Sequence, residues 1–551
     1  MTKRVLVCSA WPYGSDIPHL GNLVSSLLSG DVFARYYRLQ GYDVLYVSGT
    51  DAHGTRIEYE AAKQGRSPEE HAAAIHQEIV KINEAFGIEF DNYTWTESPV
   101  HYEFVTAIHK RMEVNGYIFS QEEERPYCQN CKRFLADRYI EGTCPHCGYE
   151  HAKGNQCPQC GALLEPEELL NPRCALCGGR EIVFKKTRHW YLDLRKLEPQ
   201  LREYVASRDF RGNVKLFTEN MLKDLRPRAI TRDLEWGIPA PFEGAEGKVI
   251  YVWAEAALGY VSATIEYFRN RGEEGRWRDF WFGDDVLQVY TQGKDNIPFH
   301  TIIFPGQLIA SGEGYHLPDQ IAATEYLNWI GGEAFSKSLN IGIYCDDALE
   351  LLEPVYWRFY LLYNRPERKD VDFSWEELEK AINGVFIDNI SNFINRVLGV
   401  AGRLYDGQVS AALEGRPLEE IKKARERVER AVEAGSLATA LRAIAELAVF
   451  GNHYFQEERP WEGGKEEVVA GGLQLAKALA IMLEPFVPQF SKEAYKLLGL
   501  ERPTFADILA VQGFHVRPAA PLLRKINIEE IKRKYEELKG RPPAEEALAH
   551  P

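Results

Sequence analysis

The stretch "RVLVCSAWPYGSDIPHLGN" (Arg4–Asn22) determines the fold that we expect for this chain. It begins with a short apolar run of the kind that forms a buried strand. Apolar residues then recur at helical spacing, which predicts a long amphipathic helix from His19 to about Gln40: Leu20, Leu23, Val24, Leu27 and Leu28. The apolar run "DVLYVSGT" (43–50) follows, so the three segments form a strand–helix–strand unit with parallel strands.

This unit predicts the first half of a doubly wound sheet, whose ligands bind outside the carboxyl ends of the strands. The corners at 11–22 and 51–55 both lie at that end and can face one pocket, and a further helix is expected after the second corner. Strand-like apolar runs return only much later, at 248–254, 285–293 and 301–310. The sheet is therefore expected to be split by an insertion.

Composition sets limits on the class of protein. The 551 residues are 45% hydrophobic and 26% charged, which is ordinary for a soluble globular protein. No secretion signal and no run of 18 apolar residues is present, so we expect a cytoplasmic protein that does not span a membrane. The formal net charge of -16 argues against unselective coating of nucleic acid. The basic, aromatic-rich stretches 184–196 and 214–228 are either a local nucleic-acid surface or a solvated charged face.

The expected fold is an α/β protein in which a split Rossmann-like parallel sheet carries an inserted zinc-knuckle domain and a C-terminal helical bundle. Long amphipathic helical patterns after about residue 370 indicate the bundle. The predicted boundaries, in chain order, are first catalytic half 1–117, connective insertion 118–235, second catalytic half 236–325, loop and stem-contact region 326–375, bundle 376–540 and a mobile tail 541–551.

Eight of the ten cysteines form four C-x-x-C pairs, which in a chain without a secretion signal indicate metal ligands. The pairs are Cys128/Cys131, Cys144/Cys147, Cys157/Cys160 and Cys174/Cys177. Two quartets of thiolates fit two closed, tetrahedral structural Zn²⁺ sites. Sequential pairing of neighbouring knuckles is favoured. Interleaved pairing, with the inner four on one metal and the outer four on the other, also fits the spacing.

Two segments suit a bound nucleotide. His19 opens the helix that leaves the first strand, where free N–H groups and the helix dipole favour phosphate, and Gly21 leaves backbone uncovered there. The Gly-rich loop "GGEAFSKSLNIGI" (331–343) offers the Lys337 ammonium and two hydroxyls to a transferring phosphate. Each segment alone is more often a helix cap or a surface loop, so the prediction rests on their combination.

"PHLGN" (18–22) resembles the His-Ile-Gly-His signature of class I aminoacyl-tRNA synthetases, and "FSKS" (335–338) resembles their Lys-Met-Ser-Lys-Ser loop. Further segments make the chain similar to the archaeal-type methionyl-tRNA synthetases from residue 1 to about 500: "SGTDAHGT" (48–55), "AITRDLEWGIPAP" (229–241), "VWAEAALGY" (252–260) and "GKDNIPFH" (293–300).

The resemblance implies an ATP-dependent ligase that charges tRNA(Met) with L-methionine through a methionyl adenylate, with Mg²⁺ accompanying ATP. It implies that His19, Gly21, Asn22 and Lys337 are catalytic. ATP would also be bound by Gly293, Asp295, Ser336 and Ser338. Methionine would be bound by Tyr13, Asp51, Trp253, Ala256, Tyr260 and His300, with Asp51 pairing the amino group. The tRNA anticodon would be read by Asn389, Asn392, Arg396 and Trp461.

The chain departs from the family pattern at a few positions. Ala334 and Leu339 stand where the family has Lys and Arg, and Glu255-Ala256-Ala257 replaces Asp-Ala-Pro. A non-catalytic zinc- and RNA-binding relative is therefore kept as an alternative, and a nucleotidyltransferase is a weaker one. The insertion is too short for the editing domain of the related leucine, isoleucine and valine enzymes. We expect a monomer that acts with a separate tRNA-binding partner protein.

Overall fold

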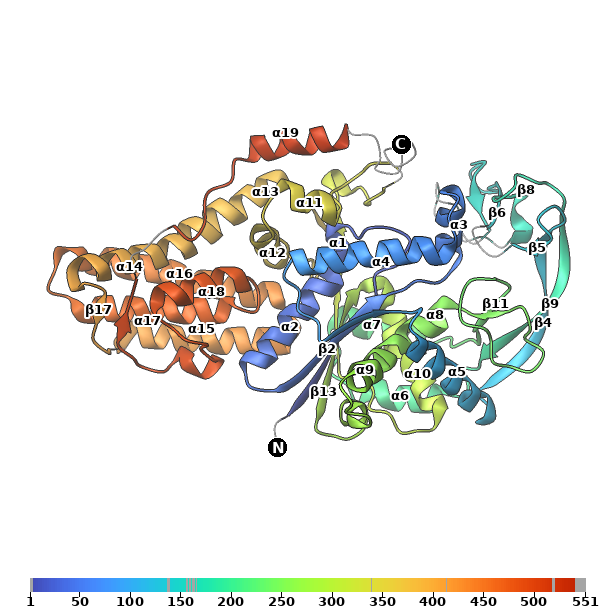
Figure 1. Ribbon diagram of the computed structural model, residues 1–551, viewed down its shortest axis with the longest axis horizontal. Helices are drawn as coiled ribbons and strands as arrows, with labels where there is room; N and C mark the ends of the chain where they lie inside the picture. The colour runs from blue at the N-terminus through green and yellow to red at the C-terminus, as the bar shows by residue number, and fades with distance from the viewer. Residues whose placement is uncertain are drawn as a thin grey trace.

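The computed structural model describes residues 3–135, 139–154, 157, 160, 164, 166–337, 339–412, 414–517 and 521–540. Ser338 and the expected tail 541–551 lie outside the described residues. The molecule is elongated, with the α/β part in the middle, the C-terminal helices at one end and the cysteine-bearing insertion at the other (Figure 1).

A five-stranded parallel sheet forms the centre of the α/β part, as expected. Its strands, in sheet order, are β14 (Gln320–Thr324), β13 (Val286–Gly293), β1 (Arg4–Ser9), β2 (Asp43–Thr50) and β3 (Asn92–Trp95). β1 is central, with Val5 opposite Leu287 of β13 and Val44 of β2. The strands predicted at 4–10, 43–50 and 285–293 are confirmed, and the two edge strands β3 and β14 were not predicted.

The long helix after β1 is confirmed and has one irregular turn. It runs through α1 (Leu20–Asn22), the π-helical turn η1 (Leu23–Leu27) and α2 (Leu28–Leu39). The other helices around the sheet are α3 (Thr55–Lys63), α4 (Pro68–Ala85), α5 (Pro99–Val114), α6 (Glu198–Ala206), α7 (Gly212–Met221), α8 (Val252–Glu255), α9 (Gly259–Asn270) and α10 (Phe304–Ser311). Helix α3 confirms the helix expected after the second corner.

Two of the predicted strands are wrong. The run 301–310 is helical and ends in α10, which is buried along nearly all its length. A continuous apolar run fits a buried helix as well as a buried strand, so periodicity could not separate the two. In the run 248–254 only β12 (Val249–Ile250) is a strand, and it pairs with β11 (Thr231–Arg232) outside the central sheet.

The insertion is built on two long antiparallel strands, β4 (Ile118–Cys128) and β9 (Ile182–Leu192). Their pairing runs from Ile118 opposite Leu192 to Cys128 opposite Ile182, so the far end holds the start and end of the cysteine-rich segment together. Short strands complete it: β5 (Arg133–Phe134), β6 (Ile140–Thr143), β7 (Ala152–Lys153), β8 (Leu170–Cys174) and β10 (Arg228–Ala229).

The C-terminal part is a helical bundle, as expected (Figure 1). Its helices and those that connect it to the sheet are α11 (Cys345–Leu351), α12 (Pro354–Tyr363), α13 (Trp375–Glu379), the π-helical η9 (Lys380–Ser391), α14 (Asn392–Tyr405), α15 (Gly415–Glu433), α16 (Leu437–Glu458), α17 (Glu466–Leu483), α18 (Pro488–Leu498) and α19 (Ile528–Lys539). The bundle shares one apolar core with α1–α2. Within the described ranges, no helix has both the length and the apolar character to cross a bilayer.

Candidate functional site

His19 sits at the N-terminus of α1, at the carboxyl end of β1, and its side chain caps the helix. Its Nδ1 accepts hydrogen bonds from the backbone N–H groups of Gly21 at 3.1 Å and Asn22 at 3.4 Å. In turn, Asn22 Oδ1 accepts a hydrogen bond from the backbone N–H of His19. Burial lowers the pKa of His19 to about 4. The imidazole is therefore neutral at pH 7, with its proton on Nε2, the nitrogen available to a phosphate oxygen.

Glycine is required at position 21 because a Cβ there would lie 2.9 Å from the His19 ring. The other side of the ring is covered by Phe335, which stacks on His19 at 4.4 Å between centroids with an interplanar angle of 3°. Tyr344 contacts the same ring edge-on at 6.1 Å. The structure thus places the Gly-rich loop directly against the N-terminal corner, some 300 residues away in the sequence.

The Gly-rich loop forms a tight antiparallel turn. Ser336 and Ile341 exchange backbone hydrogen bonds of 3.1 and 2.8 Å, and Asn340 occupies the left-handed region at φ 55°. The Lys337 ammonium, exposed at the tip, pairs with the Asp16 carboxylate of the N-terminal corner. Lys337 and His19 therefore belong to one site, and Asp16 and Phe335 are members of it that the sequence did not predict.

The predicted ribose-side residues lie at the carboxyl end of β13. Gly293 is the last residue of this strand, and Asp295 follows in a short 3-10 turn. The Asp295 carboxylate accepts a hydrogen bond from the Tyr326 hydroxyl, and Lys294 holds Glu325 at 2.9 Å and Asp370 at 2.6 Å. These side chains lie beside the point between β13 and β1 at which the strand order reverses. Doubly wound folds bind nucleotides at this point.

Tyr13 and Asp51 come from the two predicted corners and meet as a parallel β-bridge. The backbone holds them with Asp51 N–H to Pro12 O at 2.9 Å and Gly14 N–H to Asp51 O at 2.7 Å. The Tyr13 hydroxyl lies against Gly54, where a Cβ would be 2.4 Å from it and φ is 106°. Burial, and then the nearby Glu255 carboxylate, raise the pKa of Asp51 well above its usual range. A cationic group bound beside Asp51 would favour its ionised form.

The remaining residues predicted to bind methionine come from α8, α9 and the turn before α10. The Tyr260 hydroxyl and His300 Nε2 are 2.8 Å apart, and both side chains are buried. Burial lowers the pKa of His300 to about 4, although its Nδ1 bonds Asn296 O. Trp253 is 44% exposed and stacks on Phe299 at 4.5 Å, and Ala256, half-buried, begins the 3-10 turn that follows α8.

Comparison with known proteins identifies the family. A family model described as "tRNA synthetases class I (M)" matches residues 5–398, and a second, "Anticodon binding domain of methionyl tRNA ligase", matches residues 405–540. The chain belongs to the methionyl class I tRNA synthetases. Relatives named methionine–tRNA ligase include one from Caldivirga maquilingensis, 46% identical over 99% of this chain and 97% of the relative. Another, from Thermofilum pendens, is 46% identical over 98% of both chains.

The fold of this class I synthetase is also similar to that of solved structures. Mycobacterium tuberculosis methionyl-tRNA synthetase in complex with methionyl-adenylate aligns with a TM-score of 0.78 and 22% sequence identity, covering 95% of this chain and 99% of that one. The free-state structure of the same protein aligns with a TM-score of 0.71 and 21% identity.

Of the four residues predicted to read the anticodon, Trp461 lies in the part matched as the anticodon-binding domain, and the other three lie at the end of the part matched by the class I synthetase model: Asn389, Asn392 and Arg396. Arg396 of α14 lies over the Trp461 ring, 4.8 Å from its centroid, and donates to Gln456 Oε1 at 3.1 Å. Asn392 donates to Asp388 Oδ1 at 3.2 Å, and the Asn389 carbonyl accepts from Asn452 at 2.9 Å. The structure thus brings Arg396 and Trp461 into contact, whereas Asn392 begins α14 and Asn389 lies near the end of the preceding η9.

The cysteines of this synthetase form two groups, as predicted, but the favoured sequential pairing is wrong. One group is the outer four, Cys128, Cys131, Cys174 and Cys177, and the other is the inner four, Cys144, Cys147, Cys157 and Cys160. The pairing of β4 with β9 decides this, because it brings the ends of the insertion together. The Sγ–Sγ distances measured in each group are 3.6–3.8 Å. These distances fit tetrahedral Zn²⁺ with Zn–S bonds of about 2.3 Å, whose edge is about 3.8 Å.

A buried polar cluster behind Asp51 was not predicted. His53 Nδ1 and Glu255 Oε1 are 2.6 Å apart, although the residues are 202 positions apart in the sequence. His53 Nε2 contacts Glu97, and His101 Nε2 lies 3.8 Å from Glu255. A signal was present, because His53 lies inside the "SGTDAHGT" motif and Glu255 was recognised as a departure from the family pattern.

Proposed function

We propose that this class I synthetase is a methionine–tRNA ligase, which activates L-methionine with ATP and transfers it to tRNA(Met). The observation that carries the proposal is the convergence of His19, Lys337 and Asp51 at the carboxyl edge of one parallel sheet. Relatives named methionine–tRNA ligase at 46% identity over nearly the full length of this chain support the choice of amino acid.

In the first step, the methionine carboxylate attacks the α-phosphorus of ATP. An O–P bond to the carboxylate forms, the bond to the bridging oxygen breaks, and pyrophosphate leaves with its electron pair. His19 Nε2–H donates to an α-phosphate oxygen, and Lys337 offsets the charge that builds on the leaving group. The N–H groups of Gly21 and Asn22 hold the His19 ring through Nδ1, so these two residues would position His19 beside the nucleotide, and Gly293 and Asp295 would face the ribose. Mg²⁺ would accompany ATP, bound mainly through its phosphates.

The Lys337 ammonium pairs with Asp16 at the tip of the loop, and in the proposed reaction it would bind the pyrophosphate. Ser336 lies beside Lys337 in the same turn and would contribute its hydroxyl, and Ser338, outside the described residues, would contribute the second. Phe335 stacks on His19 and places this loop beside the residue that would contact the α-phosphate.

Recognition of methionine rests on the Asp51 side of the site. The substrate ammonium would pair with the Asp51 carboxylate, whose burial strengthens that attraction. Tyr13, Trp253, Ala256, Tyr260 and His300 would enclose the side chain, and aromatic rings contact a thioether sulfur favourably. The neutral state of His300 keeps a second cation out of this pocket.

In the second step, a hydroxyl of the terminal ribose of the tRNA attacks the methionyl carbonyl carbon. The ester bond forms, the bond from this carbon to the phosphate oxygen breaks, and AMP leaves as the hydroxyl loses its proton. Trp461, held by Arg396, would stack on an unpaired anticodon base, while Asn389 and Asn392 would bond base edges. The two zinc sites stabilise the insertion and take no part in the chemistry. The domain boundaries predicted from the sequence, a cytoplasmic location, a monomeric state and a separate tRNA-binding partner protein are parts of this proposal.

Methionine-dependent exchange of labelled pyrophosphate into ATP tests the activation step without tRNA. We expect exchange with methionine and none with leucine, isoleucine or valine, followed by charging of tRNA(Met) when tRNA is added. Absence of exchange with protein that retains its zinc would support the alternative, a non-catalytic RNA-binding relative. Exchange with another amino acid would support the activation reaction and refute methionine as its substrate.

A further inference from the structure

The residues that we assign to methionine binding lie on two separate segments of the chain. Asp51 is on the turn that follows β2, while Trp253 and Ala256 flank Glu255 at the junction of α8 and the next turn. His53, two residues after Asp51, and Glu255 turn away from the exposed site and meet in the interior, with 1% and 0% of their surfaces exposed. Their 2.6 Å contact joins the two segments.

The geometry at His53 favours an imidazolium over a neutral ring. Nδ1 faces Glu255 and Nε2 faces Glu97, and a neutral imidazole has only one N–H to donate. Burial opposes this charge, but the Glu255 and Glu97 carboxylates raise the pKa of His53 to about 10. Despite burial, His53 also keeps the pKa of Glu255 below its usual value. The contact is therefore a buried ion pair, which is costly to break from one side.

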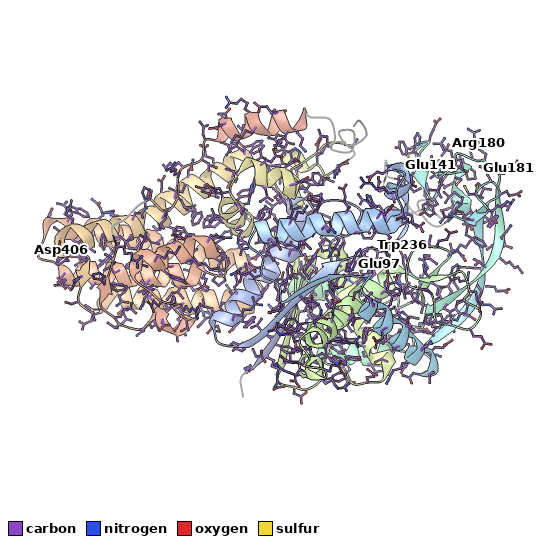
Figure 2. All side chains as sticks on the ribbon, viewed as in Figure 1. Glu97, Glu141, Arg180, Glu181, Trp236 and Asp406 are labelled. Atoms are coloured by element: carbon purple, nitrogen blue, oxygen red, sulfur yellow. The ribbon has the colours of Figure 1, made fainter. Side chains whose placement is uncertain are left out.

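Neighbouring groups hold this ion pair in place. The Glu97 carboxylate also accepts the Tyr102 hydroxyl at 2.5 Å, and the Trp236 ring packs edge-on against His53 at 5.4 Å. Trp236 Nε1 donates to the Ala52 carbonyl at 2.7 Å, which fixes the turn between Asp51 and His53. Figure 2 shows Glu97 and Trp236 close together between the central sheet and the insertion.

We propose that His53 and Glu255 are positioning residues for the amino-acid substrate, whose buried contact fixes Asp51 relative to Trp253 and Ala256. The proposal rests on the function proposed above and adds two residues that do not touch the substrate. A displacement of about 1 Å within such a site is enough to cost about 100-fold. The ion pair therefore holds Asp51, which would bind the substrate ammonium, at a fixed position relative to the pocket for the methionine side chain.

The charges around His53 give the contact a second role. The carboxylates of Asp51, Glu97 and Glu255 surround this one imidazolium, and His101 approaches Glu255 from α5 while bonding Ser262 at 2.8 Å. The backbone N–H of His53 also donates to Asp51 Oδ1 at 3.5 Å. His53 lies between the Glu255 and Glu97 carboxylates and offsets their mutual repulsion, which keeps the segment that carries Asp51 close to the segment that carries Glu255.

The test uses His53→Gln and Glu255→Gln in the full chain, with methionine and ATP varied separately in pyrophosphate exchange. We expect the KM for methionine to rise about 10- to 100-fold in each variant while the KM for ATP stays within about threefold. The double variant, which can form a neutral amide pair, should be no worse than the poorer single one. Glu255→Asp keeps the charge and should recover most of the methionine affinity.

His109→Gln is the matched control. His109 is also fully buried on α5, but its Nδ1 bonds the Val105 carbonyl of its own helix. The proposal is overturned if this variant shifts the KM for methionine equally, or if the His53 and Glu255 variants raise both KM values in parallel. Thermal unfolding of each variant identifies general loss of structure, and Glu255→Asp remains informative if a Gln variant does not fold. If the wild-type chain activates a different amino acid, the proposed function fails, and the same comparison of KM values is made with that amino acid.

Discussion

The pairing of the eight cysteines can be tested by two matched double substitutions. Cys131→Ser with Cys174→Ser removes two ligands whose Sγ atoms are 3.8 Å apart in the outer group. Cys131→Ser with Cys147→Ser removes one ligand from each group. Both variants lose two thiols, so they differ only in how the losses are distributed between the sites.

The expected zinc contents follow from the geometry. In each group the measured Sγ–Sγ distances of 3.6–3.8 Å suit one tetrahedral ion, and the two groups share no cysteine. Structural zinc binds with about 10–16 kcal/mol through all four ligands, so a site with two or three of them is strongly weakened. The first variant should retain about one zinc ion per chain and the second close to none after a brief exposure to chelator.

The assay is metal analysis of protein purified by gel filtration, with thermal unfolding measured on the same samples. Sequential pairing makes the opposite prediction, because Cys131 and Cys147 would then share one site. Zinc retained in the second variant and lost in the first would therefore refute both the pairing and the strand register that produces it. The wild-type chain, expected to hold about two zinc ions, is the reference.

Three further predictions concern other parts of the molecule. Lys337→Ala should slow adenylate formation about 10²- to 10³-fold with little change in methionine affinity, since one charged contact to the leaving group is lost; a change within about threefold would refute the loop assignment. Trp461→Ala should lower kcat/KM for tRNA(Met) about 5- to 150-fold, which corresponds to the loss of one base stack, while pyrophosphate exchange is unchanged. Equal loss in both assays would show that Trp461 stabilises the fold and does not bind the anticodon. Lys477 is fully buried in α17, and burial lowers its pKa from 10.5 to about 8. The native state therefore binds fewer protons than the unfolded state between about pH 8 and 10.5, and stability from this group rises with pH there. Lys477→Met should stabilise the protein by about 1–3 kcal/mol at pH 7, and this gain should shrink as pH rises to 10.5; a gain that is constant with pH in denaturant unfolding would contradict this reasoning.

Much of the candidate site could be predicted from short segments. The strand-and-helix pattern around His19, the Gly-rich loop around Lys337 and the C-x-x-C spacing each depend on residues that are close in the sequence. The strands β1, β2 and β13 and the bundle helices are also patterns of local periodicity. The sequence by itself therefore determined which residue types are candidates for the proposed chemistry and where β1, β2 and β13 lie, because neighbouring residues set both.

Only the tertiary structure decided how these parts pair. The segment 301–310 is a nearly buried helix, and its apolar run fits a buried strand equally well, so the choice depends on the surrounding structure. The interleaved cysteine groups follow from the register of β4 with β9, in which Cys128 lies opposite Ile182. The His53–Glu255 contact joins residues 202 positions apart, so no local sequence pattern predicts it. Each of these outcomes depends on which distant surfaces pack together, and packing energy is a property of pairs of segments rather than of any one of them.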